Sequence, residues 1–314
     1  MSSHEFAGTG RLFSYRLAMA DWHQREDFDD LRVATGRIEA LLRADAAPGD
    51  LLAAEFKTFS QWNEDGIIQH LIRHVPIDNP TFIEFGVEDY RESNTRFLLV
   101  NNGWRGLIVD GGEAHQKFVY EQSTLGWRYA IDARRAFVSP DTINALFRDA
   151  GFVGDIGLLS IDVDGIDYWM WRAVEVVSPR IVVVEFNSTF GADHAITVPY
   201  DPDFDYAAAH YSYLFFGASL PAFIHLAQQK GYRFVGCESH GANAFFVRDD
   251  VADSLPALTV AEGYVASQFR SARDEAGRLV FTDTHRAQLD VIAGMEVETV
   301  PEGRRTTIGQ LFGR

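Results

Sequence analysis

Four apolar runs along the chain each end in an acidic or amide residue. The runs are rich in β-branched residues and have no polar face, which is typical of strands buried on both sides of a parallel sheet. They cover residues 81–86, 106–110, 157–162 and 180–187. Ligands of open α/β sheets bind beyond the carboxyl ends of such strands. Acids repeated at these ends therefore predict a ligand site there.

Helical periodicity precedes and separates these runs. Apolar residues recur at helical spacing within 31–42 and again within 64–74. Strands and helices then alternate between residues 81 and 187, with a further strand expected over 127–132 and a helix over 140–148. This alternation predicts an α/β fold with a doubly wound, mostly parallel sheet, preceded by N-terminal helices.

The second half of the chain has a different pattern. Residues 190–213 are rich in Tyr, Asp, Pro and His and lack periodicity, so we expect a long functional loop. A helix over 220–230 precedes two alternating runs, 232–236 and 244–248, which predict an antiparallel C-terminal hairpin. The residues after 250 carry little signal. We therefore expect an N-terminal helical extension (1–54), a central domain (55–250) and a C-terminal extension (251–314).

Composition narrows the classes of partner. The 314-residue chain has a formal net charge of -17, which argues against nucleic acid and against an anionic membrane surface, whereas a neutral sugar is compatible with it. The single cysteine, Cys237, fits a reducing compartment. No secretory signal and no run long enough to span a membrane is apparent, so we expect a cytoplasmic protein. Homo-oligomerisation stays open.

The end of the first run is not a dinucleotide-binding fingerprint. That fingerprint needs three glycines, G-x-G-x-x-G, to bring a helix N-terminus against a pyrophosphate. Here only Gly86 is present, and Glu84, Glu88 and Asp89 lie where a phosphate would have to come. A cofactor with a positive centre, an ammonium group and a ribose diol suits this strand end better than NAD. S-adenosylmethionine has all three.

Motifs in chain order resemble those of the FkbM-type class I S-adenosylmethionine-dependent methyltransferase family. In the first half they are SQWNEDG (60–66), FIEFG (82–86), SNT (93–95), GWRGL (103–107) and SIDVDG (160–165). In the second half they are GASL (217–220), KGY (230–232) and GANAFFV (241–247). The resemblance covers roughly residues 60–248. It implies a Rossmann-like fold, S-adenosylmethionine as the cofactor and methyl transfer as the activity.

The resemblance also implies a cofactor site along the first two strand ends. Asp110, at the end of the second run, would accept both ribose hydroxyls, or it would serve only a turn. Glu84 would hold the cofactor's ammonium group, and Gly86 would allow its close approach. Ser93 and Asn94 would position its carboxylate, although Asn94 equally suits a helix cap.

Two later strand ends carry further candidates. Asp132, expected at the end of the third strand, would receive the adenine amine. Asp162 would lie beside the transferred methyl group, as a cofactor contact and a catalytic residue. As a D-x-D motif, Asp162 and Asp164 would instead hold a metal and the diphosphate of a nucleotide-sugar. A calcium loop is excluded, because the glycine comes two positions early and no Glu closes the loop.

Glu185 and Asn187 repeat this two-residue spacing at the next strand end. Together with Asp162 and Asp164 they supply the hard oxygen ligands that Mg²⁺ or Mn²⁺ accepts. The set resembles the Asp/Asp/Asn site of metal-dependent small-molecule O-methyltransferases. A hydrogen-bonded cluster without a metal is the alternative.

Two histidines are candidates for the general base. His240 stands in a turn between the last two predicted strands, above the same sheet edge, and His194 lies in the long loop. The function expected from the sequence is S-adenosylmethionine-dependent O-methylation of a sugar or glycosylated small molecule or polysaccharide. The alternatives are a metal-dependent glycosyltransferase and a methyltransferase-like scaffold without activity.

Overall fold

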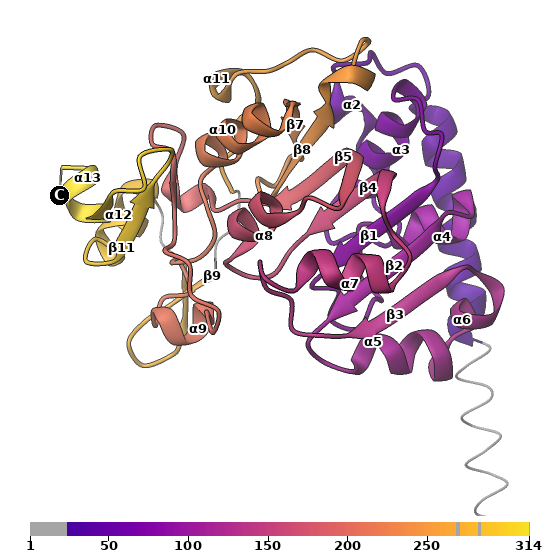
Figure 1. Cartoon of the computed structure of the whole chain (residues 1–314), viewed down its shortest axis with the longest axis horizontal. Helices are drawn as coiled ribbons and strands as arrows, with labels where there is room; N and C mark the ends of the chain where they lie inside the picture. The colour runs from indigo at the N-terminus through magenta and orange to yellow at the C-terminus, as the bar shows by residue number, and fades with distance from the viewer. Residues whose placement is uncertain (1–23, 268–270, 282–283, 314) are drawn as a thin grey trace, which may run out of the picture.

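The computed structural model describes residues 24–267, 271–281 and 284–313. A seven-stranded sheet lies at its centre, with the strand order β3-β2-β1-β4-β5-β8-β7 (Figure 1). The strands are β1 (Thr81–Phe85), β2 (Arg105–Asp110), β3 (Ile131–Arg135), β4 (Gly154–Ile161), β5 (Val177–Glu185), β7 (Tyr232–Cys237) and β8 (Asn243–Arg248).

The strands β3, β2, β1, β4 and β5 pair in parallel, and β8 pairs antiparallel with both β5 and β7. The order reverses between β1 and β4, so these two strands flank the point where a crevice opens in a doubly wound sheet. This topology confirms the predicted α/β fold with an antiparallel C-terminal hairpin. All five residues of β1 are buried, as expected for a strand covered on both faces.

Helices cover both faces of the sheet. One face packs against α7 (Ile143–Asp149), α8 (Asp167–Ala173) and α10 (Leu220–Lys230). The other face packs against α3 (Glu64–His74), α4 (Arg96–Asn102), η1 (Phe118–Gln122) and α6 (Leu125–Arg128), and α5 (Ala114–Lys117) leads into η1. The bounds of α3 and α10 agree with the sequence prediction. In α10 the left-handed Gly231 ends the helix.

The N-terminal extension is helical from residue 24 to residue 42 and continues into α2 (Leu51–Ala54). The helix packs outside α4, where Ala40 joins a small apolar cluster with Phe56, Phe59 and Phe97. An ion pair between Asp29 and Arg96 fixes its first turns. Figure 1 shows this helix along the right-hand side of the molecule.

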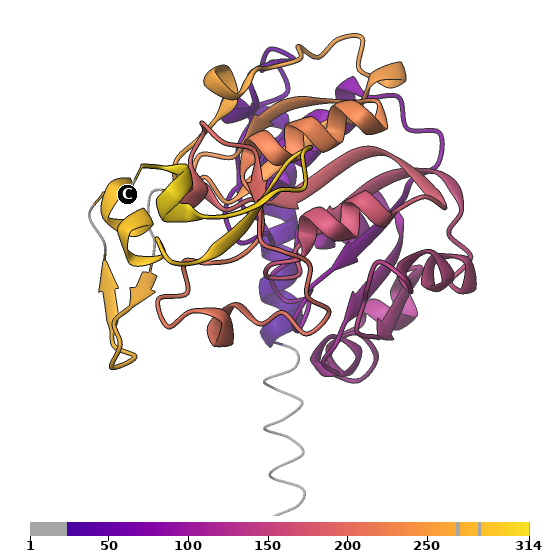
Figure 2. The ribbon, with the colours of Figure 1, turned by 60° about the vertical axis from the view of Figure 1, so that its left-hand side comes forward.

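The C-terminal segment folds back on the long loop. A three-stranded sheet joins β6 (Ile196–Thr197) to β11 (Glu296–Thr299) and β12 (Arg305–Thr307), and β9 (Ser271–Arg273) pairs with β10 (Leu279–Phe281). Figure 2 shows these elements together on one side of the central sheet. The short helices of this part are η2 (Ser188–Phe190), α9 (Tyr206–Ala209), η3 (Asp249–Val251), α11 (Val260–Gly263), α12 (His285–Val291) and α13 (Ile308–Leu311).

The expected third strand was placed too early. Residues 125–128 form α6 instead, and β3 runs over 131–135. β3 is an edge strand with mixed burial, and Trp127, which opened the expected strand, is 73% exposed on α6. An edge strand lacks the continuous apolar run that identified the buried strands.

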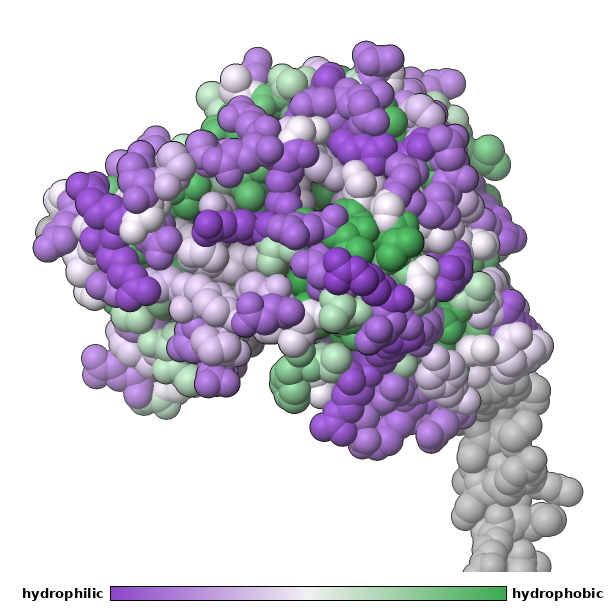
Figure 3. Space-filling view, in the orientation of Figure 1, coloured by the Kyte–Doolittle hydropathy of each residue, from purple (hydrophilic) through white to green (hydrophobic). Residues whose placement is uncertain are grey.

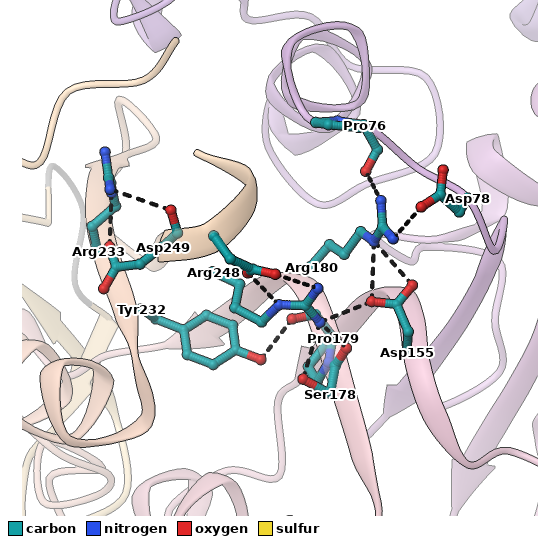
Figure 4. A network of polar contacts seen from close by, with 11 residues as sticks. Pro76, Asp78, Asp155, Ser178, Pro179, Arg180, Tyr232, Arg233, Arg248 and Asp249 are labelled. Atoms are coloured by element: carbon teal, nitrogen blue, oxygen red, sulfur yellow. Dashed lines mark hydrogen bonds and ion pairs between the residues drawn. The ribbon is translucent and has the colours of Figure 1, made fainter. Parts of the chain in front are cut away.

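Ion pairs close the amino edge of the sheet (Figure 4). Asp155 of β4 accepts from Arg180 of β5 at 2.9 Å and lies 2.9 Å from the guanidinium of Arg248 at the end of β8. Arg180 also pairs with Asp78 at 2.5 Å. At this edge each of these carboxylates therefore pairs with an arginine.

Across the face seen in Figure 3, apolar residues appear as small groups among polar ones.

Candidate active site

Three adjoining hollows lie over the carboxyl ends of the strands. The aromatic hollow, beside Trp62, Tyr206 and His240, has a volume of about 350 Å³. The acidic hollow, over Glu84 and Asp162, measures about 190 Å³, and the Phe137 hollow, over Asp110, about 530 Å³. Asp164 lines all three. The hollows therefore form one groove across the point where the strand order reverses.

Glu84 lies at the floor of the acidic hollow and orders the loop beside it. Its carboxylate accepts from Ser93 Oγ at 2.6 Å, from the Asn94 backbone N–H at 2.9 Å and from Thr95. Burial raises the pKa of Glu84, while these hydrogen bonds oppose the shift. The Asn94 side chain donates to Ser160 Oγ at 3.1 Å and so ties the loop to β4. Ser93, Asn94 and Glu84 therefore act as one unit that lines the hollow.

Gly86 follows β1 and has a φ of +68°. A Cβ added there would lie 1.4 Å from the backbone carbonyl oxygen of Asp162. The turn therefore requires glycine both for its left-handed backbone and for the contact between the β1 and β4 ends. Gly86 lines both the acidic and the Phe137 hollow.

Asp110 ends β2 and lines the Phe137 hollow. One carboxylate oxygen accepts from the Glu88 backbone N–H at 2.9 Å and the other from Gly112 at 2.7 Å. Each oxygen keeps a further lone pair for a ligand. The two backbone hydrogen bonds fix the direction of the carboxylate at the edge of the hollow.

Asp132 does not lie at a strand end, and that part of the prediction is wrong. It is the second residue of β3 and is in register with Leu107, whereas Arg135 is in register with Asp110. Its carboxylate pairs with Arg134 at 2.9 Å. The residues that follow β3 and line the hollow are Ala136, Phe137 and Val138. The misplaced strand explains why the sequence did not identify them.

Three carboxylates gather where the hollows meet. One oxygen each of Asp162, Asp164 and Glu185 lie within 4.8 Å of one another. The pKa of Asp162 is raised well above its ordinary value by burial and then by Glu185, and burial and Glu88 raise the pKa of Asp164. Carboxylates so placed repel one another, so a bound cation would stabilise their charged forms.

Asn187, predicted as a fourth ligand, is engaged with the backbone. Its amide donates to the carbonyls of Leu214 and Phe216, each at 2.9 Å, and its oxygen accepts from Thr189 N–H at 2.9 Å. Asn187 therefore links the long loop to the end of β5 by hydrogen bonds. Its role as a ligand stays a prediction.

Asp167, which sequence reasoning passed over, holds the loop that carries Asp162 and Asp164. It is fully buried and accepts from the backbone N–H groups of Val163 at 2.8 Å and Gly165 at 3.0 Å. Burial raises its pKa to about 6. Asp167 lies five residues after Asp162 in the sequence. From the sequence, Asp167 was considered only as part of a calcium loop and was given no other role.

The aromatic hollow contains His240 stacked on Trp62, with 4.4 Å between ring centroids and 14° between planes. The fully buried Glu238 accepts from the backbone N–H groups of His240, Ala242 at 2.5 Å and Asn243 at 3.1 Å. Its carboxylate also lies 3.4 Å from His240 Nδ1. Glu238 therefore orders the turn that carries the imidazole, whose Nδ1 also lies 3.3 Å from Ser239 Oγ. Sequence reasoning missed both Glu238 and Trp62.

Glu64 lies behind this turn and is fully buried. It accepts from the Trp62 backbone N–H at 2.9 Å and from the Asn243 amide at 2.8 Å. Burial, with a further contribution from Glu238, raises the pKa of Glu64 to about 7. Two buried carboxyls thus stand behind the histidine.

The opposite wall of the aromatic hollow comes from the long loop and β9. Tyr206 meets Tyr213 edge-on at 5.3 Å, and the Arg273 guanidinium lies 5.0 Å from the centre of the Tyr213 ring. Arg273 also donates to the Gly277 carbonyl at 3.1 Å. Among the described residues lining the three hollows, it is the only lysine or arginine.

His194 lies away from the residues that line the groove. Its ring meets Phe312 edge-on at 4.8 Å, and its carbonyl accepts from Ser219 Oγ at 2.7 Å. The structure thus brings Glu84, Gly86, Ser93, Asn94, Asp110, Asp162, Asp164, Glu185 and His240 to the hollows. Asp132, Asn187 and His194 do not line them.

No protein-family model matches this chain, and no curated protein matches it. Similar solved structures include the following three. The N-terminal domain of EvdMO1 with SAH bound has 11% identity and a TM-score of 0.37, covering 60% of this chain and 80% of that one. An O-methyltransferase family protein from Burkholderia thailandensis has 11% identity and a TM-score of 0.36, covering 78% and 60%.

The carbon methyltransferase CurJ has 11% identity and a TM-score of 0.37, covering 74% of this chain and 70% of that chain. Among the described residues, no helix is long and apolar enough to cross a membrane.

Proposed function

We propose that this protein is an S-adenosylmethionine-dependent O-methyltransferase of the FkbM type that acts on a hydroxyl of a sugar or glycosylated compound. The observation that carries the proposal is the groove over the carboxyl ends, where carboxylates gather around a glycine-only turn. A sulfonium and an ammonium group would match this charge. An anionic dinucleotide would not.

The cofactor would be held by residues from three strand ends. The Asp110 carboxylate would accept the two ribose hydroxyls, and Phe137 with Val138 would supply an apolar surface for the adenine. Glu84 and Asn94, in the acidic hollow, would hold the ammonium and carboxylate of the methionine part. S-adenosylmethionine, when bound, supplies the electrophilic methyl group.

The acceptor would occupy the aromatic hollow. Trp62, Tyr206 and Tyr213 offer flat surfaces and hydroxyls that suit the stacking and hydrogen bonding of a sugar ring. His240 would take the proton of the attacking hydroxyl at an imidazole nitrogen, and Glu238 would keep the imidazole in position. The protein thus contributes alignment of the two reactants and a place for the released proton.

A divalent cation at Asp162, Asp164 and Glu185 is the second part of the proposal. Three carboxylate oxygens within 4.8 Å of one another fit the donor set of Mg²⁺ or Mn²⁺. A metal there would lower the pKa of the acceptor hydroxyl. Turnover is expected to fall in excess chelator and to return with Mg²⁺. Full turnover in chelator would show that the carboxylates act without a metal.

The competing proposal is a metal-dependent glycosyltransferase, favoured by the proximity of Asp162 and Asp164, its D-x-D pair. Calorimetric titration separates the two. S-adenosylmethionine and its demethylated product are expected to bind without a metal, and nucleotide-sugars are expected not to bind with or without Mn²⁺. Binding of a nucleotide-sugar alone would establish the glycosyltransferase. Binding of neither would favour a scaffold without activity.

A further inference from the structure

The N-terminal helix exposes an apolar stripe on the side away from the body of the protein. The stripe consists of Phe28, Leu31, Ile38, Leu41 and Leu42, which are 58%, 62%, 58%, 72% and 74% exposed. Their spacing of three, seven, three and one residues places them along one side of the helix. Large exposed apolar patches of this kind mark interaction sites.

The opposite side of the same helix is already fixed to the protein. Val33 and Ala40 pack into the cluster with Phe56, Phe59 and Phe97. The carbonyl of Ala40 accepts from Arg73 at 2.6 Å, and Asp29 pairs with Arg96. These contacts fix the helix so that the stripe faces away from the protein. Within the described residues, no other part of the chain covers the stripe.

Four residues of the stripe, Phe28, Leu31, Ile38 and Leu41, are spaced symmetrically about the middle of the helix, whereas Leu42 has Asp27 at the corresponding position. A second copy running antiparallel, centred between Ala34 and Thr35, would place Leu31 opposite its Ile38 and Phe28 opposite its Leu41. The small Ala34 and Thr35 would meet at the centre and let the two helices approach closely. An isologous two-fold contact needs this self-complementarity, because the same surface of both chains forms it: where residue i of one chain meets residue j of the other, residue j also meets residue i.

The charges beside the stripe follow the same symmetry. One flank carries Asp30 and Arg37, and the other carries Arg32 and Glu39, each an acid and a base seven residues apart. In the antiparallel arrangement each flank faces the same flank of the other copy, and each acid lies two residues, or roughly 3 Å along the helix axes, from the level of the other copy's base. Within one chain Arg37 also donates to Asn101 at 2.8 Å and Glu39 pairs with Arg43. Charge complementarity thus favours a second copy of this chain over an unrelated partner.

We propose that this helix is the interface of a two-fold homodimer in which the stripes of two chains pack antiparallel. The interface lies on the helix outside α4, apart from the groove, and does not depend on the proposed activity. The test is the molecular mass in solution by analytical ultracentrifugation. The wild-type chain is expected to have twice the 35.2 kDa of one chain, and a monomer at micromolar concentration would overturn the proposal.

The double variant Leu31→Glu/Ile38→Glu is expected to raise the dimer dissociation constant about 100-fold or more, because it buries charges in the contact. Val153→Glu is the matched control, since Val153 is also 58% exposed but lies outside this helix. An unchanged dimer in the double variant would overturn the proposal.

Charge reversal provides a second test that does not depend on apolar burial. Asp30→Arg is expected to weaken the dimer, and Asp30→Arg/Arg37→Asp is expected to restore it, because the exchanged charges again face each other. Further weakening in the double reversal would overturn the antiparallel register.

Cross-linking tests the register directly, because the native Cys237 is buried. Thr35→Cys lies near the proposed two-fold axis and is expected to form a disulfide-linked dimer on oxidation. Gln24→Cys should not cross-link, since two such positions would lie about 30 Å apart along the helices. Cross-linking of Gln24→Cys with none of Thr35→Cys would overturn the arrangement.

Discussion

The two edges of the central sheet differ in how their charged side chains are paired. At the amino edge, Asp155 faces Arg180 and Arg248 (Figure 4). At the carboxyl edge, one oxygen each of Asp162, Asp164 and Glu185 lie within 4.8 Å of one another, and the pKa values of Asp162 and Asp164 are raised. Paired charges stabilise the fold, whereas gathered like charges cost stability unless a ligand compensates for them. The difference indicates which edge is built for binding.

The largest effect that would test this comparison comes from Gly86→Ala. A Cβ there would lie 1.4 Å from the Asp162 carbonyl oxygen, so the β1 and β4 ends must separate. We expect no measurable binding of S-adenosylmethionine by calorimetry. Gly103→Ala is the matched control, because Gly103 has the same φ of +68° with open space around it. It should lose stability alone, and equal loss of binding in both variants would contradict the prediction.

Removal of the imidazole should affect turnover without affecting cofactor binding. His240→Ala is expected to lower kcat by about 10²–10⁴-fold, the usual contribution of a general base. The dissociation constant of S-adenosylmethionine should change little, because His240 lines the aromatic hollow and not the other two. Glu238→Gln should give a smaller loss with an altered pH profile of kcat. A wild-type kcat in His240→Ala would remove this residue from the mechanism.

Asp110→Asn should weaken the cofactor at the carboxyl edge. The variant loses charge-assisted hydrogen bonds to the ribose, each worth about 1.5–3 kcal/mol, so affinity should fall about 100-fold. Asp132→Asn is the control, since Asp132 lies within β3 and does not line the groove. An unchanged dissociation constant in folded Asp110→Asn would show that the ribose lies elsewhere.

Protonation at the carboxyl edge should also make the free energy of unfolding depend on pH. Burial raises the pKa of Glu64 from 4.5 to about 7. Between these values the folded chain retains a proton that the unfolded chain has released, so the free energy of unfolding falls as pH rises. We expect a loss of roughly 3 kcal/mol between pH 5 and pH 8 in urea unfolding. Glu64→Gln should flatten this slope, and a wild-type stability that rises over the same range would contradict it.

The smallest effect is expected at the amino edge. Asp155→Asn removes a charge from both Arg180 and Arg248 and should lower the free energy of unfolding by about 1–3 kcal/mol. Cofactor affinity should not change, because none of these residues lines the groove. The exposed Asp253 gives a control, Asp253→Asn, with no expected loss. Weaker cofactor binding in Asp155→Asn would contradict the prediction that charges at the amino edge affect stability alone.

The strand ends could be located from the sequence because their strands are buried on both faces. β1, β2, β4 and β5 left continuous apolar runs, so the positions of Asp110, Asp162 and Glu185 followed directly. The edge strand β3 left no such run, and the residues after it were missed. A local pattern thus identifies the acidic and Phe137 hollows wherever the strand is central.

The aromatic hollow could not be predicted in this way. Trp62 reaches His240 across 178 positions of sequence, and Arg273 reaches Tyr213 from the C-terminal segment. No periodicity records such contacts, because tertiary packing alone brings these residues together. The expected long loop also contains β6, whose partner β11 lies about a hundred residues later in the chain.

The pairing of β6 with β11 has a consequence during synthesis. Ile196 and Val198 share an apolar cluster with Leu214, Val297 and Ile308. Until β11 and α13 have been synthesised this cluster is incomplete, although the seven strands of the central sheet have already been made. The central sheet can therefore form on a nascent chain before the cluster that holds the long loop is complete.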